Sequence, residues 1–201
     1  MRTITREYTL FPIHELSGEA QQTAYYKWLE QVEYTFSSDN SSTMDEFAKL
    51  FDLNIRNWSY DAYSYNYSFF TSLSGEVEEL SGERLARYIH NNHWCRIFTP
   101  KIYWGAMKVG GKTTKRLSRI FYTSDCPLTG YCADCAILKP IYDFLTHPDS
   151  KITYLKLMER CLESFFQFCR DDVSYTQSEE SFKEMSQAND WEYLSNGKLF
   201  N

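Results

Sequence analysis

Apolar and polar residues alternate in several stretches of the chain, and this period of two predicts β-strands. Near the N-terminus the alternation ends at Pro12, which stops a strand. In the middle of the chain two alternating runs flank Gly110-Gly111, which is a hairpin signal. Strands are expected over residues 6–13, 53–60, 63–70, 95–108, 113–123, 191–194 and 198–200.

Elsewhere the apolar residues recur every three to four positions, which predicts amphipathic helices. Ala20, Ala24 and Trp28 illustrate this spacing in the first helix, which follows the capping residue Ser17. Helices are expected over residues 18–35, 43–51, 81–92, 133–147 and 151–172, with a last short helix after residue 178. These patterns predict an α+β fold over residues 1–201, a single domain in which helices pack on one face of an antiparallel sheet.

One of the expected strands carries an unusual aromatic face. Its two faces alternate between aromatic residues and small polar ones, the aromatic set being Tyr63, Tyr65, Tyr67 and Phe69. Such a row of rings could stack nucleic-acid bases. It could instead be the inner face of a sheet that packs on helices, and we favour this second interpretation because amphipathic strands usually bury their apolar face.

The composition is that of a globular protein with 201 residues and a net charge of −6, and it is rich in Tyr and Phe. No apolar run approaches the roughly 18 residues that a membrane span needs. The residues from Met1 to Glu7 lack the apolar core of a signal peptide. We therefore expect a cytoplasmic protein with no membrane partner.

Three of the six cysteines lie within ten residues of one another, in a loop that contains a Pro and a Gly. Cys132 and Cys135 have the C-x2-C spacing that lets two thiolates hold one zinc ion, and Cys126 lies just before them. The fourth ligand would be His93 or Cys95, from the segment that leads into the next expected strand. The sequence thus predicts a cysteine-rich loop that binds a structural Zn2+.

Two other interpretations of these cysteines stay open. They could be buried thiols that bind no metal, or a redox pair formed by Cys132 and Cys135. The redox interpretation lacks the βαβ context of thioredoxin-like motifs. No phosphate-binding loop, dinucleotide fingerprint, HExxH motif or nucleophilic serine motif is present, so we expect a protein that is not an enzyme.

Charge is distributed unevenly along the chain. The expected hairpin over residues 101–119 is basic, and Lys112, Lys115 and Arg116 are its candidate contacts with nucleic acid or another anionic partner. The competing interpretation is a solvated hairpin whose lysines prevent edge pairing. Residues 159–192 are acidic, with nine acids against three basic residues. The acids expected to bind a basic partner are Asp171, Asp172, Glu179 and Glu180.

Both ends of the chain and the cysteine loop resemble a group of phage and prophage proteins from Gram-positive bacteria, often labelled antitoxins of a toxin–antitoxin stability system. The stretches that carry this resemblance are residues 8–11, 15–20, 125–132, 188–193 and 196–198. The resemblance implies no reaction. It implies an antitoxin-like protein that binds a partner toxin, with DNA binding through residues 101–119 as a further possibility.

The chain is also similar in character to phage-encoded anti-CRISPR proteins that inhibit type II Cas9, some of which are metalloproteins. It shares their small size, acidity and lack of a catalytic motif. This similarity implies a zinc-containing inhibitor that binds Cas9 and blocks target DNA loading and cleavage by steric or electrostatic occlusion. We take this as the leading expectation and the antitoxin-like function as the alternative.

Overall fold

The structure is a computed structural model that describes residues 1–98, 101–103, 108–109, 112–113, 120–122 and 126–200. It divides into two compact units, each of which is described separately. Unit 1 comprises residues 1–35, 61–63 and 170–201, and unit 2 comprises residues 36–60 and 64–169. The prediction of a single domain stays a prediction, because this division does not measure whether either unit folds alone.

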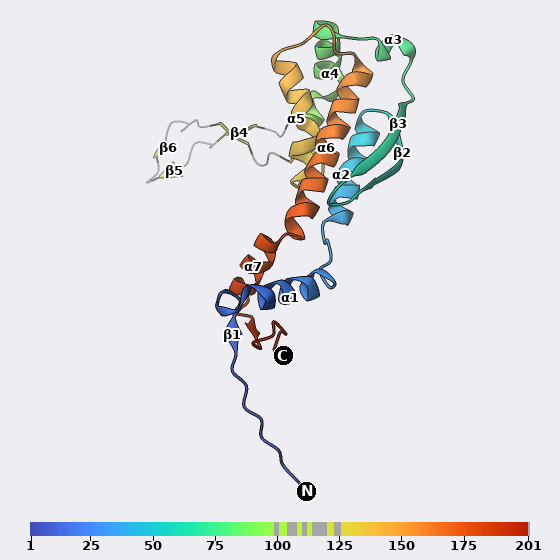
Figure 1. The fold of residues 1–201 in the computed structure, drawn as a ribbon. Helices are drawn as coiled ribbons and strands as arrows, with labels where there is room; N and C mark the ends of the chain where they lie inside the picture. The colour runs from blue at the N-terminus through green and yellow to red at the C-terminus, as the bar shows by residue number, and fades with distance from the viewer. Residues whose placement is uncertain (99–100, 104–107, 110–111, 114–119, 123–125, 201) are drawn as a thin grey trace. The chain divides into compact units, whose positions relative to one another are not determined.

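Helices form most of the regular structure (Figure 1). They are the 3-10 helix Ile13–Glu15 and α1 Gly18–Leu29, α2 Ser37–Leu50, α3 Gly75–Glu78, α4 Gly82–Ile97, α5 Ala133–Thr146, α6 Tyr154–Thr176 and α7 Glu179–Ala188. The strands are β1 Phe11–Pro12, β2 Leu53–Tyr60, β3 Tyr65–Thr71, β4 Lys101–Tyr103, β5 Lys108–Val109, β6 Lys112–Thr113, β7 Ile120–Tyr122 and β8 Glu192–Tyr193. The α+β class is confirmed.

The strands do not join into one sheet, so the expectation of a single antiparallel sheet is wrong for the described residues. They form four separate antiparallel pairs: β1 with β8, β2 with β3, β4 with β7, and β5 with β6. In the longest pair, β2–β3, the two strands pair with each other and the aromatic face packs on α6.

In unit 2 the aromatic face of the β2–β3 hairpin surrounds one side chain of α6. The ring of Phe166 lies 5.0 Å from Tyr67 and 5.6 Å from Tyr65, stacked on both, and 6.0 Å from Trp58. Phe166 itself is fully buried. The row of rings is therefore the inner face of a hairpin on a helix, which confirms the interpretation favoured from the sequence. Tyr63 lies before the strand and is 91% exposed.

The core of unit 2 joins α2, α4, α5 and α6, which lie beside one another in Figure 1. Helix α4 is longer than expected and continues to Ile97, because Ile89 and Ile97 extend its buried stripe. His93 and Cys95 consequently lie on this helix rather than on a segment entering a strand. Pro140 lies inside α5 and does not end it.

Helix α2 begins at Ser37, six residues before the expected start. The polar stretch 37–42 lacks apolar residues at helical spacing, so the sequence pattern predicts no helix there. In the structure its Asn40 is buried and donates to the Tyr60 hydroxyl at 3.1 Å. A buried amide that finds a partner from β2 thus lets the helix extend through a polar sequence.

Unit 1 is built from α1, α7 and the β1–β8 pair around a small core. The side-chain hydroxyls of Ser17 and Ser178 cap α1 and α7, accepting from the amides of Ala20 at 3.4 Å and Ser181 at 3.1 Å. The buried core residues are Ile13, Leu16, Ala20, Ala24, Phe182 and Tyr193. After β8 the chain turns at Gly197, which has a φ of +79° and packs closely on the backbone of α1.

Candidate functional site

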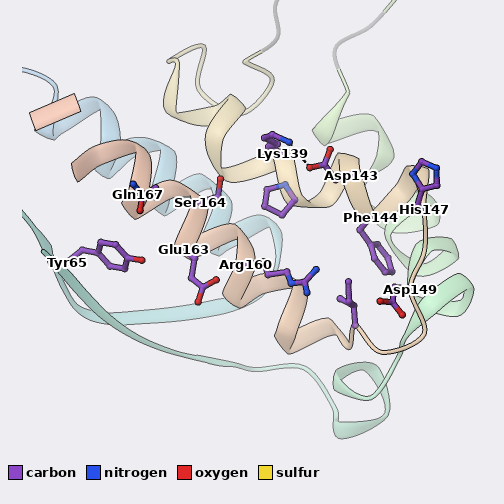
Figure 2. Close-up of a pocket in the computed structure, with 12 residues that line it drawn as sticks. Tyr65, Lys139, Asp143, Phe144, His147, Asp149, Arg160, Glu163, Ser164 and Gln167 are labelled. Atoms are coloured by element: carbon purple, nitrogen blue, oxygen red, sulfur yellow. Dashed lines mark hydrogen bonds and ion pairs between the residues drawn. The ribbon is translucent and has the colours of Figure 1, made fainter. Parts of the chain in front are cut away.

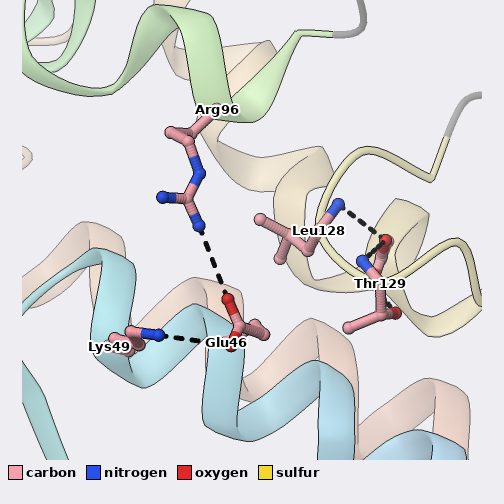
Figure 3. Close-up of polar contacts among 6 residues, drawn as sticks. Glu46, Lys49, Arg96, Leu128 and Thr129 are labelled. Atoms are coloured by element: carbon pink, nitrogen blue, oxygen red, sulfur yellow. Dashed lines mark hydrogen bonds and ion pairs between the residues drawn. The ribbon is translucent and has the colours of Figure 1, made fainter.

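The cysteine loop of unit 2 is organised by the carboxylate of Asp134, which is fully buried at the start of α5. Its Oδ2 accepts from the backbone amides of Leu128 at 2.8 Å, Thr129 at 2.7 Å and Gly130 at 3.2 Å. Its Oδ1 accepts from the hydroxyls of Thr129 at 2.8 Å and Thr43 at 3.0 Å. Figure 3 labels Leu128 and Thr129, and its dashed lines mark the hydrogen bonds that their amides donate.

These five hydrogen bonds offset the cost of burying a charge, which is large for a carboxylate that lacks donors. They also determine the path of the loop, because three successive amides converge on one oxygen. Thr43 belongs to α2, so the same carboxylate ties the loop and α5 to that helix. The loop is thus held by protein groups of unit 2.

A second polar contact links α2 to α4 at the surface (Figure 3). Glu46 of α2 lies 3.4 Å from Arg96 of α4 and 3.6 Å from Lys49 of its own helix. All three side chains are at least one-third exposed, and exposed ion pairs contribute about 0–1 kcal/mol. This cluster therefore adds little to the stability that Asp134 supplies from the interior.

The loop brings two of its three thiols together. The sulfur atoms of Cys126 and Cys135 lie 3.6 Å apart, and both side chains are partly exposed. Cys132, the residue before α5, is exposed. Two thiolates bound to one zinc with Zn–S distances of about 2.3 Å lie about 3.7 Å apart in a tetrahedron, so this pair fits two of four ligands.

The remaining predicted ligands are not assembled with that pair. His93 packs its ring between Phe51, at 4.7 Å between centroids, and Tyr88, at 5.8 Å, and it is buried. Cys95 is exposed on α4. Within the residues that the structure describes, no three Cys, His, Asp or Glu side chains gather as a metal-binding group. Zinc binding by Cys126, Cys132 and Cys135 with His93 or Cys95 stays a prediction.

The environment of His93 is that of a core residue. Its Nε2 is buried and has no hydrogen-bond partner within the described structure. Burial lowers the pKa of His93, and the nearby Asp52 carboxylate opposes this shift in part. The neutral imidazole therefore acts as an aromatic spacer between α4 and the Phe51 ring at neutral pH.

The four acids expected to bind a partner lie in unit 1. We call them the acidic segment: Asp171 and Asp172 near the end of α6, and Glu179 and Glu180 in the first turn of α7. Asp171, Glu179 and Glu180 are exposed, while Asp172 is half-buried. Nearby basic groups neutralise part of this charge, since Arg170 lies 3.0 Å from Asp171 and Lys183 lies 3.9 Å from Glu179.

Tyrosine side chains accompany these acids. The hydroxyl of Tyr34 donates to Asp172 at 2.6 Å. Tyr25 lies beside Glu179, and burial, then that carboxylate, then the Tyr26 and Tyr63 hydroxyls raise the pKa of Tyr25. Tyr26 is 59% exposed and Tyr63 is 91% exposed. Unit 1 therefore presents exposed tyrosine rings close to carboxylates, and such rings with polar tips are enriched at contact surfaces.

Charge is separated between the two units. Unit 1 contains 13 acidic and six basic residues, a net charge of −7, whereas unit 2 contains 14 acidic and 15 basic residues, a net charge of +1. The two values together give the −6 of the chain. Unit 1 thus carries the entire negative excess, which the sequence showed only as an acidic C-terminal third.

The basic hairpin predicted over residues 101–119 lies largely outside the described residues. The structure places Lys112 in β6, where the backbone pairs with β5, and describes nothing of its side chain. Lys115 and Arg116 lie outside the described residues. The predicted contact of these three cations with an anionic partner stays a prediction.

Unit 2 also contains an open groove of about 730 Å³ between α5 and α6, which Figure 2 shows. Its lining mixes charges of both signs. The charged and titratable side chains are Lys139, Asp143, His147, Asp149, Arg160 and Glu163. Lys139 pairs with Asp143 at 2.6 Å, and the Ser164 hydroxyl donates to the backbone carbonyl of Ala136 at 2.7 Å rather than to a base. The groove is polar, but the serine in it is engaged as a structural hydrogen-bond donor.

The sequence analysis missed Asp134 and the tyrosines of unit 1. Asp134 stands between Cys132 and Cys135, and its position in a helix first turn after a Pro/Gly loop could have indicated a capping role. The tyrosines come from residues far apart in the chain, such as Tyr34 and Tyr63, so no local pattern could have grouped them with the acidic segment.

Comparison with known protein families, with curated proteins and with solved structures finds no match to this chain. Among the residues that the structure describes, none of the helices combines the length and the apolar character that crossing a membrane requires.

Proposed function

We propose that this protein is a non-catalytic inhibitor that binds a basic, nucleic-acid-handling surface of another protein through the acidic segment of unit 1. The observation that carries the proposal is the separation of charge, with −7 on unit 1 and +1 on unit 2. A surface with a large excess of one sign speeds encounter with a surface of the opposite sign and disfavours partners of its own sign.

The residues around the acidic segment supply the contacts that would hold such a complex. Tyr26 and Tyr63 offer exposed rings that bury area at a low cost in side-chain entropy. The bound hydroxyl of Tyr34 holds the Asp172 carboxylate in a defined position before the partner arrives. A surface that is partly pre-organised loses less entropy on binding, so these pairs favour a stable complex.

The partner that we propose is Cas9, in the cytoplasm of a bacterial host cell. Two features support it. The chain shares small size, acidity and lack of a catalytic motif with phage-encoded inhibitors of type II Cas9, and a unit of charge −7 matches a channel that holds nucleic acid with basic side chains. Occupation of that channel excludes target DNA without any chemical step, so the protein needs no catalytic residues for this function.

The test measures binding of the purified chain to Cas9–guide RNA complexes. Neutralising the acidic segment with Asp171→Asn, Asp172→Asn, Glu179→Gln and Glu180→Gln should weaken binding at least tenfold at low salt. The matched control neutralises four exposed acids of unit 2, namely Asp45, Glu76, Glu83 and Glu159, and should leave binding within about twofold. Equal effects of the two sets would overturn the proposed surface.

The order of addition tests the mechanism. Cleavage of target DNA should be inhibited when the protein is added before the DNA and spared when it is added afterwards. Inhibition in both orders would contradict occlusion of DNA loading. Unimpaired cleavage by every Cas9 tested would remove Cas9 as the partner, and co-expression with neighbouring genes would then test the antitoxin-like alternative by asking whether the chain suppresses a toxic partner.

A further inference from the structure

The two sulfur atoms of Cys126 and Cys135 are already in contact, although nine positions separate these residues in the chain. Their Sγ atoms lie 3.6 Å apart, compared with about 2.05 Å in a disulfide. Both side chains are partly exposed, so a small thiol reagent can reach them. The remaining gap of about 1.5 Å is within the range that side-chain rotation supplies.

The backbone around this pair is held by bonds that do not involve sulfur. Asp134 accepts from the amides of Leu128, Thr129 and Gly130, and these bonds set the course of the chain between the two cysteines. Gly130 allows the turn with a φ of +90°. The two sulfur atoms therefore meet without a covalent bond between them, which is the arrangement that a reversible disulfide needs.

We propose that Cys126 and Cys135 form a reversible intramolecular disulfide by exchange with a low-molecular-weight disulfide such as glutathione disulfide. This modification is independent of the proposed binding to Cas9. It uses a pair that differs from the C-x2-C pair which the sequence suggested.

The exchange has two steps. The thiolate of one cysteine attacks a sulfur of glutathione disulfide, forms a mixed disulfide and releases one glutathione thiolate. The thiolate of the second cysteine then attacks the protein sulfur of the mixed disulfide and releases the second glutathione. The two protein thiols lose two electrons and two protons in total, and glutathione disulfide is reduced to two molecules of glutathione.

The other cysteines provide internal references. Cys161 and Cys169 are fully buried in the core, and burial raises the pKa of the Cys161 thiol. A buried thiol of this kind is inert toward exchange. Cys95 is exposed on α4 and can form only a mixed disulfide with glutathione unless another thiol reaches it. Cys132 is exposed and lies three positions before Cys135 in the chain. It could form a disulfide with Cys135 in place of Cys126, so the experiment must distinguish these two disulfides.

The experiment uses the full-length chain, reduced and then equilibrated with buffers of increasing glutathione disulfide. Remaining thiols are blocked with N-ethylmaleimide, and the chain is cut on the amino side of aspartate. This cleavage yields fragments 125–133 and 134–142, so that Cys126 and Cys132 lie in one fragment and Cys135 lies in the other. The expected product is a cross-link between the two fragments in which Cys132 is alkylated. Its mass is about 2 Da below the sum of the two fragments when Cys132 is alkylated and Cys126 and Cys135 are reduced.

Single variants identify the partner of Cys135. The cross-link should persist in Cys132→Ser and in the control Cys95→Ser, and it should be lost in Cys126→Ser. The opposite pattern, with loss only in Cys132→Ser, would overturn the assignment. Absence of a cross-link in the wild-type chain at every redox buffer would overturn the proposal as well.

The same samples separate the disulfide from the predicted zinc site. A zinc ion on Cys126 and Cys135 would protect both thiols from glutathione disulfide and would be detected by elemental analysis of the purified chain. One zinc per chain, with both thiols resistant to oxidation until a chelator is added, would overturn the disulfide proposal. Circular dichroism of each variant shows that loss of the cross-link does not come from unfolding.

Discussion

Unit 1 and unit 2 differ in the size of their hydrophobic cores and in their net charge. The described part of unit 2 buries 21 hydrophobic residues in one cluster and carries a net charge of +1. The described part of unit 1 buries six in its own cluster and carries a net charge of −7. Close packing stabilises the first, whereas self-repulsion opposes the compact state of the second. We therefore expect unit 2 to be the more stable of the two, and unit 1 to be less stable because its excess negative charge repels itself.

Unit 1 offsets this disadvantage with local devices rather than with buried area. Both of its main helices begin at a capping serine. Aromatic rings pack across its small core, with Trp28 and Phe182 5.2 Å apart. Gly197 permits a backbone contact with α1 that no other residue allows. Such features are few, so each should matter more to unit 1 than a single contact matters to the cluster of unit 2.

The largest expected effect lies in the core of unit 2. Phe166→Ala removes the ring that Tyr65, Tyr67 and Trp58 surround, and should lower the free energy of unfolding by about 3–5 kcal/mol. The control is Phe70→Ala on the outer face of the same hairpin, where the ring is 46% exposed. Urea denaturation followed by circular dichroism measures both, and similar losses would contradict the assignment of the aromatic face to the core.

Asp134→Asn should cost less but still destabilise unit 2. The amide group of Asn offers one oxygen where the carboxylate offered two, so at least one buried donor loses its acceptor, at about 1–3 kcal/mol. The control, Asp143→Asn, removes a carboxylate that is 66% exposed and pairs with Lys139, and should cost less than about 1 kcal/mol. A negligible effect of Asp134→Asn would show that the loop is held by something other than this carboxylate.

Gly197→Ala tests the close contact in unit 1. A Cβ at this position would lie 2.1 Å from the carbonyl oxygen of Ala20, and the residue has a φ of +79°. The clash and the left-handed backbone together should cost about 2 kcal/mol or more. Gly18→Ala is the control, since a Cβ there meets nothing within 4 Å at the start of α1. Hydrogen exchange should quicken at the amides of α1 and α7, and quickening in α4 and α5 alone would contradict the separate cores.

The pH dependence of unit 2 should reflect His93. Because burial lowers its pKa in the folded state, the unfolded chain binds a proton more readily below the ordinary value of about 6.5. Stability should therefore fall as the pH drops below about 6.5, with a slope of at most about 1.4 kcal/mol per pH unit. Thermal melts between pH 5 and 8 would show it. His93→Leu should remove this part of the slope, whereas His147→Gln, at an exposed histidine, should retain it.

The smallest effect concerns charge. Raising the salt concentration from about 0.1 M to about 1 M shortens the screening length from about 10 Å to about 3 Å. Repulsion within a unit of −7 then weakens, while a unit of +1 has little repulsion to lose. Hydrogen exchange should slow more in α1 and α7 than in α4 and α5. The difference in the free energy of opening should be less than about 1 kcal/mol. Equal slowing in both units would mean that self-repulsion does not weaken unit 1.

Local patterns in the sequence were sufficient to locate most of the helices and the β2–β3 hairpin. The apolar period of α6 and the alternation in β3 both depend on neighbours a few positions apart, which the sequence states directly. The pattern failed where a polar stretch gained buried partners. Helix α2 extends back to Ser37 because Asn40 and Thr43 find hydrogen bonds in β2 and in the cysteine loop.

The candidate site was predictable only in part, for the same reason. The cysteine spacing pointed to residues 124–135, and the charge count pointed to the acidic segment. The pairing of Cys126 with Cys135 depends on the path that Asp134 imposes on the loop. The tyrosines beside the acids come from residues 25–63, more than a hundred positions away from the acidic segment.

By itself the sequence determined the α+β class, the approximate positions of most helices and the total charge of −6, since these depend on composition and short-range spacing. The tertiary structure alone decided that four strand pairs remain separate, that charge divides as −7 and +1, and that two particular thiols meet. Each of these outcomes depends on which distant residues share a surface, and that choice is made by the burial of side chains and the satisfaction of polar groups over the whole chain.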